Sequence, residues 1–122
     1  MKAVFLNHTN HPYEKWSVLQ KEKASVFGTV IDFPFPQIRS EMNGDDVKLL
    51  AIENSKKIMD LQPAAVLCQG EFCYTIAMTE ILKAHHIKVL CACSERSSRE
   101  KVLPNGTVVK TSEFVFVQFR EC

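Results

Sequence analysis

The segment AAVLCQGEFCYTIAMTEILKAHHIKVLCACSER, residues 64–96, decides the fold of this chain. It begins with a short apolar run of strand length, Ala64–Cys68, and a polar break follows. Phe72–His86 then carries apolar residues at helical spacing, and a second apolar run, Ile87–Cys93, is expected to end at Ser94-Glu95-Arg96. Two buried strands joined by one helix form a βαβ unit, which requires a parallel sheet with helices on its faces.

The part of the chain before this unit shows the same alternation of strands and helices. Lys2–Asn7 and Thr29–Phe33 are apolar runs that predict two further strands. The apolar face over Tyr13–Phe27 predicts a helix between them. Asp45-Asp46 is expected to begin a second amphipathic helix, because acidic side chains suit the positive end of a helix dipole.

The pattern changes after the fourth predicted strand. Ser98–Leu103 and Thr107–Lys110 flank Asn105-Gly106, a dipeptide that is a strong signal for a β-hairpin. Phe114–Phe119 predicts one more strand. We therefore expect one three-layer α/β domain over residues 1–122, with a parallel four-stranded core sheet followed by a C-terminal β-hairpin and strand.

Composition limits the classes of partner. The chain has 122 residues, of which 46% are hydrophobic, and a formal net charge of +1. Such a weak charge gives no general attraction to long nucleic acid or to an anionic membrane. No apolar run approaches the roughly 20 residues that a membrane-spanning helix needs. Any polyanion must therefore be held by a local site.

Five cysteines are present, an odd number at spacings that match no zinc motif: Cys68, Cys73, Cys91, Cys93 and Cys122. Free thiols and the lack of a recognisable signal peptide favour a reducing, cytoplasmic location. Walker, G-x-G-x-x-G, G-x-S-x-G and HExxH motifs are also missing from the sequence. A site that uses neither a metal nor a cofactor is the simplest interpretation.

Polar side chains are predicted at the carboxyl ends of three parallel strands, the edge at which ligands of parallel sheets bind. They are Asn7, His8 and Thr9 after the first strand, Gln69, Gly70 and Glu71 after the third, Ser94, Glu95 and Arg96 after the fourth, and Tyr74 and Thr75 on the first turn of the third helix. We expect these ends to meet in one crevice that can hold a nucleotide.

The residues leave several roles open. Gly70 allows a ligand to approach the backbone, or only forms the turn. Glu71 accepts from a ribose hydroxyl or a base amino group, or caps its helix. His8 moves a proton, or is a loop histidine that caps a turn. Arg96 neutralises a phosphate through its planar donor fork, or forms an ion pair.

Several of these segments together resemble the small CRISPR-associated proteins of type III systems, single-domain relatives of the CARF (CRISPR-associated Rossmann fold) group. The resemblance runs over nearly the whole chain and lies in Asn7–Pro12, Ile31–Pro36, Val66–Thr75, Ile87–Leu90, Ser94-Glu95-Arg96 and Phe114–Glu121. It implies a Rossmann-like fold and a homodimer that binds a cyclic oligoadenylate across its two-fold axis. It further implies a ring nuclease, which opens this second messenger and switches off the antiviral response.

In such an enzyme a ribose 2′-hydroxyl attacks the neighbouring phosphate, without a metal, and gives a 2′,3′-cyclic phosphate. Under this hypothesis His8, Arg96 and Glu71 are the catalytic residues. The ligand-binding residues are Asn7, Thr9, Gln69, Gly70, Tyr74, Thr75, Ser94 and Glu95. Two alternatives stay open: a binder of the same messenger that does not cleave it, and a small nucleoside-processing enzyme with Glu71 or Glu95 as nucleophile. A flavodoxin-like binder is disfavoured, because no Ser/Thr-rich phosphate loop follows the first strand.

Overall fold

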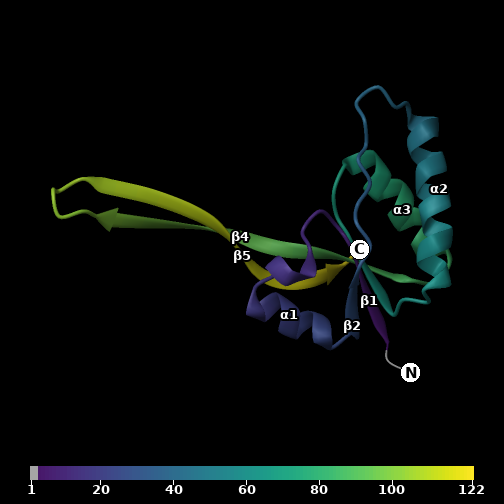
Figure 1. Cartoon of the computed structure of the whole chain (residues 1–122), viewed down its shortest axis with the longest axis horizontal. Helices are drawn as coiled ribbons and strands as arrows, with labels where there is room; N and C mark the ends of the chain where they lie inside the picture. The colour runs from purple at the N-terminus through teal and green to yellow at the C-terminus, as the bar shows by residue number, and fades with distance from the viewer. Residues whose placement is uncertain (1–2) are drawn as a thin grey trace.

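The computed structural model describes residues 3–122 and shows a mixed α/β fold (Figure 1). Its strands and helices follow in the order β1 (Val4–His8), the 3-10 helix η1 (Tyr13–Lys15), α1 (Val18–Ser25), β2 (Thr29–Asp32), α2 (Gly44–Asp60), β3 (Ala65–Cys68), α3 (Phe72–Ala84), β4 (Lys88–Val102) and β5 (Val108–Glu121). Lys2, which the sequence places in the first strand, lies outside the described residues. None of the described helices is both long and apolar enough to cross a bilayer.

The strands form one sheet in the order β2-β1-β3-β4-β5. The first four are parallel, and β5 runs antiparallel to β4. The parallel pairs are short, since β3 aligns with β4 only from Ala65↔Lys88 to Leu67↔Leu90. The sheet is therefore mostly parallel, and β3 is its central strand.

Helices cover both faces of the sheet. On one face Leu6, Val66 and Val89 pack against α2 and α3 in a buried apolar cluster. On the other face Phe5 and Leu67 pack with Trp16 and α1. The strands alternate buried side chains between these two clusters, as expected for a sheet with a helical layer on each side.

Local signals at the helix starts explain where these helices begin. The Asn43 side chain accepts from the Asp46 backbone N–H (2.9 Å), and the Asp46 carboxylate accepts from the Asn43 N–H (3.2 Å), which forms a capping box for α2. The predicted start of the second helix is confirmed. The single helix predicted over Tyr13–Phe27 is wrong, because extended backbone at Trp16 and the N-cap Ser17 separates η1 from α1.

The end of the fourth strand differs most from the prediction. Ser94-Glu95-Arg96 does not terminate β4, which continues to Val102 because β5 pairs with it from Leu90 to Val102. The turn at Asn105-Gly106 is confirmed, with Gly106 at a φ of +84°. No separate strand follows this hairpin in the described chain, since Val108–Glu121 is one continuous strand. The C-terminal part of β4 and the N-terminal part of β5 project together from the body as a long ribbon (Figure 1).

Candidate functional site

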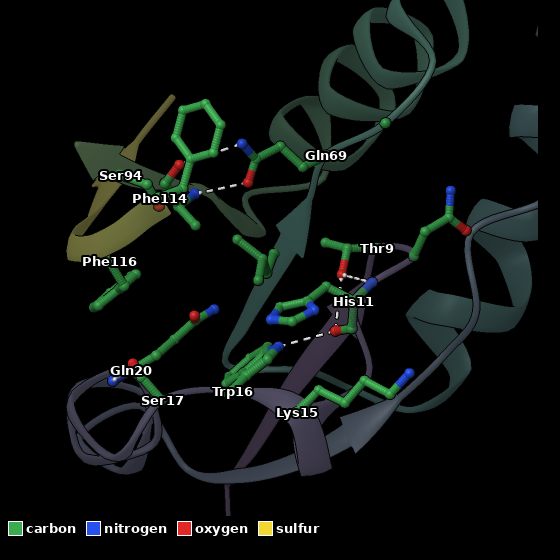
Figure 2. A pocket seen from close by; sticks show the side chains of 14 residues that line it. Thr9, His11, Lys15, Trp16, Ser17, Gln20, Gln69, Ser94, Phe114 and Phe116 are labelled. Atoms are coloured by element: carbon green, nitrogen blue, oxygen red, sulfur yellow. Dashed lines mark hydrogen bonds between the residues drawn. The ribbon is translucent and has the colours of Figure 1, made fainter. Parts of the chain in front are cut away.

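An open cavity of about 900 Å³ lies at the carboxyl edge of the parallel strands, on the α1 side of the sheet. Its walls come from the loop after β1, from η1 and the start of α1, from the end of β3 and from the base of the β4–β5 ribbon (Figure 2). The lining residues are Thr9, Asn10, His11, Lys15, Trp16, Ser17, Gln20, Leu67, Gln69, Gly70, Ala92, Ser94, Phe114 and Phe116. This volume is typical of a pocket for a nucleotide-sized molecule.

The lining suits an anion that also carries aromatic rings. Among the described residues that form it, Lys15 is the single Lys or Arg side chain, and none is an acid. Trp16, Phe114 and Phe116 supply aromatic surface, and Phe114 is 77% exposed. Without a carboxylate to repel it, a phosphate can approach Lys15 while a base stacks on an aromatic ring.

Gln20 is the most unusual polar residue of this lining. Its residue is only 6% exposed and its side-chain amide forms no hydrogen bond within residues 3–122, but the amide atoms are not fully buried and keep access to the open cavity. An amide at the wall of an open cavity that makes no bond to the protein is free to bond to water or to a ligand. An amide that offers one donor and one acceptor side by side is the group that pairs with the edge of an adenine base.

Gln69, by contrast, is already used by the protein itself. Its Oε1 accepts from the Ala92 backbone N–H (2.9 Å), and its Nε2 donates to the Ala92 carbonyl (3.2 Å), as the dashed lines of Figure 2 show. The amide thus continues the β3–β4 pairing beyond the end of β3. Gly70, which also lines the cavity, lies under the Phe35 ring, whose Cζ would be 2.5 Å from an added Cβ. The close approach at Gly70 is made by the protein's own ring.

His8 lies away from the cavity, on the α2–α3 side of the sheet. It is fully buried, and its Nδ1 donates to the Phe33 carbonyl (2.7 Å). The Nε2 then accepts from the Tyr74 hydroxyl (2.8 Å), and that hydroxyl oxygen accepts from Asn54 Nδ2 (3.1 Å). This chain of hydrogen bonds fixes the neutral tautomer. Burial lowers the pKa of His8, and the bond to the Phe33 carbonyl opposes that shift.

Two predicted ligand residues on α3 lie on this buried side as well. The Tyr74 ring is fully buried, and burial raises the pKa of Tyr74 to about 12, against a lowering contribution from Asn54. The Thr75 hydroxyl is also buried and has no hydrogen-bond partner among the described side chains. Neither residue lines the cavity.

Glu71 is the N-cap of α3. One carboxylate oxygen accepts from the Cys73 N–H (3.0 Å), the other from the Tyr74 N–H (2.8 Å). These two bonds, first that from Tyr74, lower the pKa of the exposed Glu71 carboxyl. Glu71 therefore acts as a helix cap. Its carboxylate occupies the position at the N-terminus of α3 where a ligand anion would otherwise bind.

The remaining predicted residues divide between the two sides of the cavity. Asn7 donates to the His11 carbonyl (2.9 Å) and to Asp32 Oδ1 (2.8 Å), and its Oδ1 accepts from Thr9 (2.7 Å), so it holds the loop that forms one wall. Ser94 lines the cavity, whereas Glu95 and Arg96 lie further along the exposed ribbon. Their functional roles stay predictions.

The structure thus gathers four predicted residues around the cavity: Thr9, Gln69, Gly70 and Ser94. Sequence reasoning missed Lys15, Gln20 and Phe114. Trp16 also lines the cavity, although it is only 4% exposed and packs in the cluster on the α1 side, and its Nε1 donates to the His11 carbonyl (2.9 Å). A polar residue at a helix position facing the core, such as Gln20, is the one signal that could have pointed to this wall.

The burial of His8 predicts a pH dependence of stability. Because the pKa of His8 is lowered in the folded state, only the unfolded chain takes up this proton as the pH falls below the ordinary value of 6.5. We expect the contribution of His8 to be complete above that value and to be lost as the pH falls towards the folded pKa. Urea unfolding between pH 7.5 and pH 5 should show that His8→Gln has a flatter profile than the native chain. His85→Gln, at the exposed end of α3, serves as control, and equal slopes for all three proteins would contradict the prediction.

Fold and cavity together define a three-layer α/β protein with an acid-free binding cavity at the carboxyl edge of its parallel strands. Within residues 3–122, no group of three or more His, Cys, Asp or Glu side chains is placed to hold a metal ion. A family model described as "Uncharacterized protein MJ1673 family" matches residues 3–120, and the chain belongs to this family. No curated protein matches the chain.

Proposed function

We propose that this protein binds a cyclic oligoadenylate in the cavity beside α1, as a Rossmann-like domain of CARF type that acts as a homodimer in the cytoplasm during a type III CRISPR response. The observation that supports this most is the cavity-facing amide of Gln20, which makes no hydrogen bond within the described residues, in a lining that holds a lysine, aromatic rings and no acid. Adenine edge, base face and phosphate each find a matching group there.

The position of each group favours this kind of ligand over a free phosphate. Lys15 and Gln20 lie on η1 and α1, and Phe114 lies on the opposite wall, at the base of the ribbon. A ligand that meets all three must span the cavity, as a nucleotide does. Ser17, the N-cap of α1, adds the positive end of a short helix dipole to the same wall.

Cleavage is the second candidate function. The ligand's 2′-oxygen would attack phosphorus, the bond to the 5′-oxygen would break, and that oxygen would leave with a proton as a 5′-hydroxyl. Of the proposed catalytic residues, His8 and Glu71 do not line the cavity. Arg96 faces Phe114 in the β4–β5 register and therefore comes nearest to it. Contacts to the ligand are thus better supported than a proton transfer, and binding is the function we put first.

Calorimetric titration with cyclic tri-, tetra- and hexaadenylate tests binding directly. We expect one of these rings to bind, with linear tetraadenylate and inorganic phosphate as weaker comparisons. Incubation followed by mass spectrometry then separates the two functions, because a 2′,3′-cyclic phosphate product shows cleavage and intact ring shows binding alone. No heat of binding with any of the three rings would overturn the proposal.

Gln20→Leu gives this proposal a sharper test. Loss of the amide should weaken ring binding by about tenfold, which is within the usual worth of an amide–adenine pair. The free energy of unfolding should not fall, because an amide that makes no hydrogen bond to the protein contributes little to folding. Gln37→Leu, an exposed amide in the loop after β2, is the matched control and should change neither quantity. Unchanged affinity in Gln20→Leu would remove the amide from the site.

A further inference from the structure

The projecting ribbon, Ser94–Val102 of β4 with Val108–Phe116 of β5, is here called the arm (Figure 1). Nearly all of its side chains are exposed, and Phe116 at its base is the one buried residue in it. Val102 is 68% exposed and Phe114 is 77% exposed. An isolated two-stranded ribbon is only marginally stable in water, so an arm without a core needs a further partner.

The arm also has an open edge. β3 pairs with β4 only as far as Leu90, and the Gln69 amide extends this pairing to Ala92. From Ser94 onward, no described strand pairs with the edge of β4 that faces away from β5. The backbone N–H and C=O groups along this edge are a template for another strand.

The charges along this edge are arranged to match a second copy of themselves. A two-fold axis normal to a sheet leaves each side chain on its original face of the sheet. Directly opposite residues on two antiparallel strands also point to the same face, so the numbers of two paired residues must add to an even number. With Ser98 on the axis, Arg96 lies opposite Glu100 of the second copy, and Glu95 lies opposite Lys101 of the second copy. Opposite charges then meet on both faces, and each pair occurs twice.

Neighbouring registers do not fit as well. Moving the axis to Arg99 sets this arginine against its own copy, and moving it to Ser97 keeps only one kind of opposite-charge pair, Glu95 with Arg99. The outer edge of β5 has no symmetric match, because Lys110 and Glu113 sum to an odd number and cannot face each other. Charge complementarity therefore selects both the β4 edge and one register.

We propose that two copies of this chain join through the β4 edges of their arms, with Ser98 at the two-fold axis, in a four-stranded antiparallel sheet β5-β4-β4-β5. This pairing would be the interface of the homodimer in the proposed function. The experiments below measure dimer formation without ligand, so the interface and the ligand binding can each be contradicted separately. The same register puts Val102 opposite Ser94 of the second copy, and Ser94 lines the cavity. The tip of each arm thus reaches the rim of the other copy's cavity.

Charge reversal tests the register. Glu95 and Lys101 form no ion pair within the described chain, so Glu95→Lys and Lys101→Glu leave the intrachain contacts in place. Analytical ultracentrifugation should show a dimer for the native chain and a dissociation constant about tenfold or more higher for each single variant. The double variant, which restores opposite charges, should return close to the native constant. Glu121→Lys, the same charge change outside the arm, should have no effect.

Disulfide trapping tests the axis. Ser98→Cys places two thiols on adjacent strands, within reach of a disulfide, and oxidation should yield a covalent dimer. Ser112 faces Ser98 on β5, so two Ser112 positions would be about 14 Å apart, three strand spacings. Ser112→Cys should therefore cross-link no more than the native chain. A monomeric native chain, charge variants that all dimerise equally, or cross-linking by Ser112→Cys in place of Ser98→Cys would each overturn the proposal.

Discussion

Replacing Tyr74 with alanine is expected to lower the free energy of unfolding by about 4 kcal/mol, the usual cost of removing a large buried aromatic side chain. The ring is fully buried between β1 and α2, and it packs on Phe35 with centroids 4.9 Å apart. Its hydroxyl also joins His8 to Asn54. The substitution therefore leaves a cavity and two polar side chains without their shared partner.

Tyr74→Phe separates these two contributions. It keeps the ring and removes only the hydroxyl, so we expect a loss of about 1–3 kcal/mol from the unpaired groups of His8 and Asn54. Tyr13→Phe is the matched control, because the Tyr13 hydroxyl makes no hydrogen bond within residues 3–122, and its effect should stay below about 0.5 kcal/mol. Urea unfolding measures all three. A Tyr74→Phe variant as stable as the native chain would show that the hydrogen-bond chain carries no stability.

The second large effect is expected on the opposite face of the sheet, where Phe5→Ala should cost about 3–5 kcal/mol. Phe5 is fully buried, with ring centroids 5.2 Å from Phe119, 5.4 Å from Phe27 and 6.2 Å from Trp16. Since Phe119 belongs to the part of β5 that follows the arm, this ring cluster holds the C-terminal end of β5 against β1. Loss of Phe5 should loosen both the sheet and one wall of the cavity.

Phe72→Ala is the control for this prediction, because Phe72 is 75% exposed at the start of α3 and should change stability by less than about 0.5 kcal/mol. Thermal and urea unfolding of both variants give the comparison. Phe5→Leu, which keeps most of the apolar volume, should lie between the two. If Phe5→Ala and Phe72→Ala lost equal stability, the α1-side cluster would not be a core that holds the sheet.

At the candidate site, some sequence signals predicted the location of a side chain correctly and others did not. The predicted strand ends indicated a site at the carboxyl edge of the sheet. Four of the predicted residues line a cavity there: Thr9, Gln69, Gly70 and Ser94. His8 was expected at the same edge, but as a residue still within β1 it alternates to the other face of the sheet. A shift of one residue at the end of a strand decides which face a side chain takes.

Capping illustrates a second limit of sequence reasoning. Glu71 fits both a ligand contact and an N-cap in sequence, and only the hydrogen bonds to the Cys73 and Tyr74 N–H groups distinguish between them. For Lys15 and Gln20 the sequence gives too little indication of a site, rather than two competing interpretations. Apart from the core-facing helix position of Gln20, nothing in their local pattern marks them, because their wall exists only once η1 and α1 fold over the end of β3.

The amino-acid sequence by itself determined the alternation of strands and helices, the parallel order of the central strands and the turn at Asn105-Gly106. These features depend on periodicity and on local backbone preferences, which act over a few residues. The tertiary structure decided that Ser94-Glu95-Arg96 continues a strand, and it also decided which side of the sheet holds the cavity. Pairing with β5 and packing of α1 join residues distant along the chain, and such contacts leave no local pattern to read.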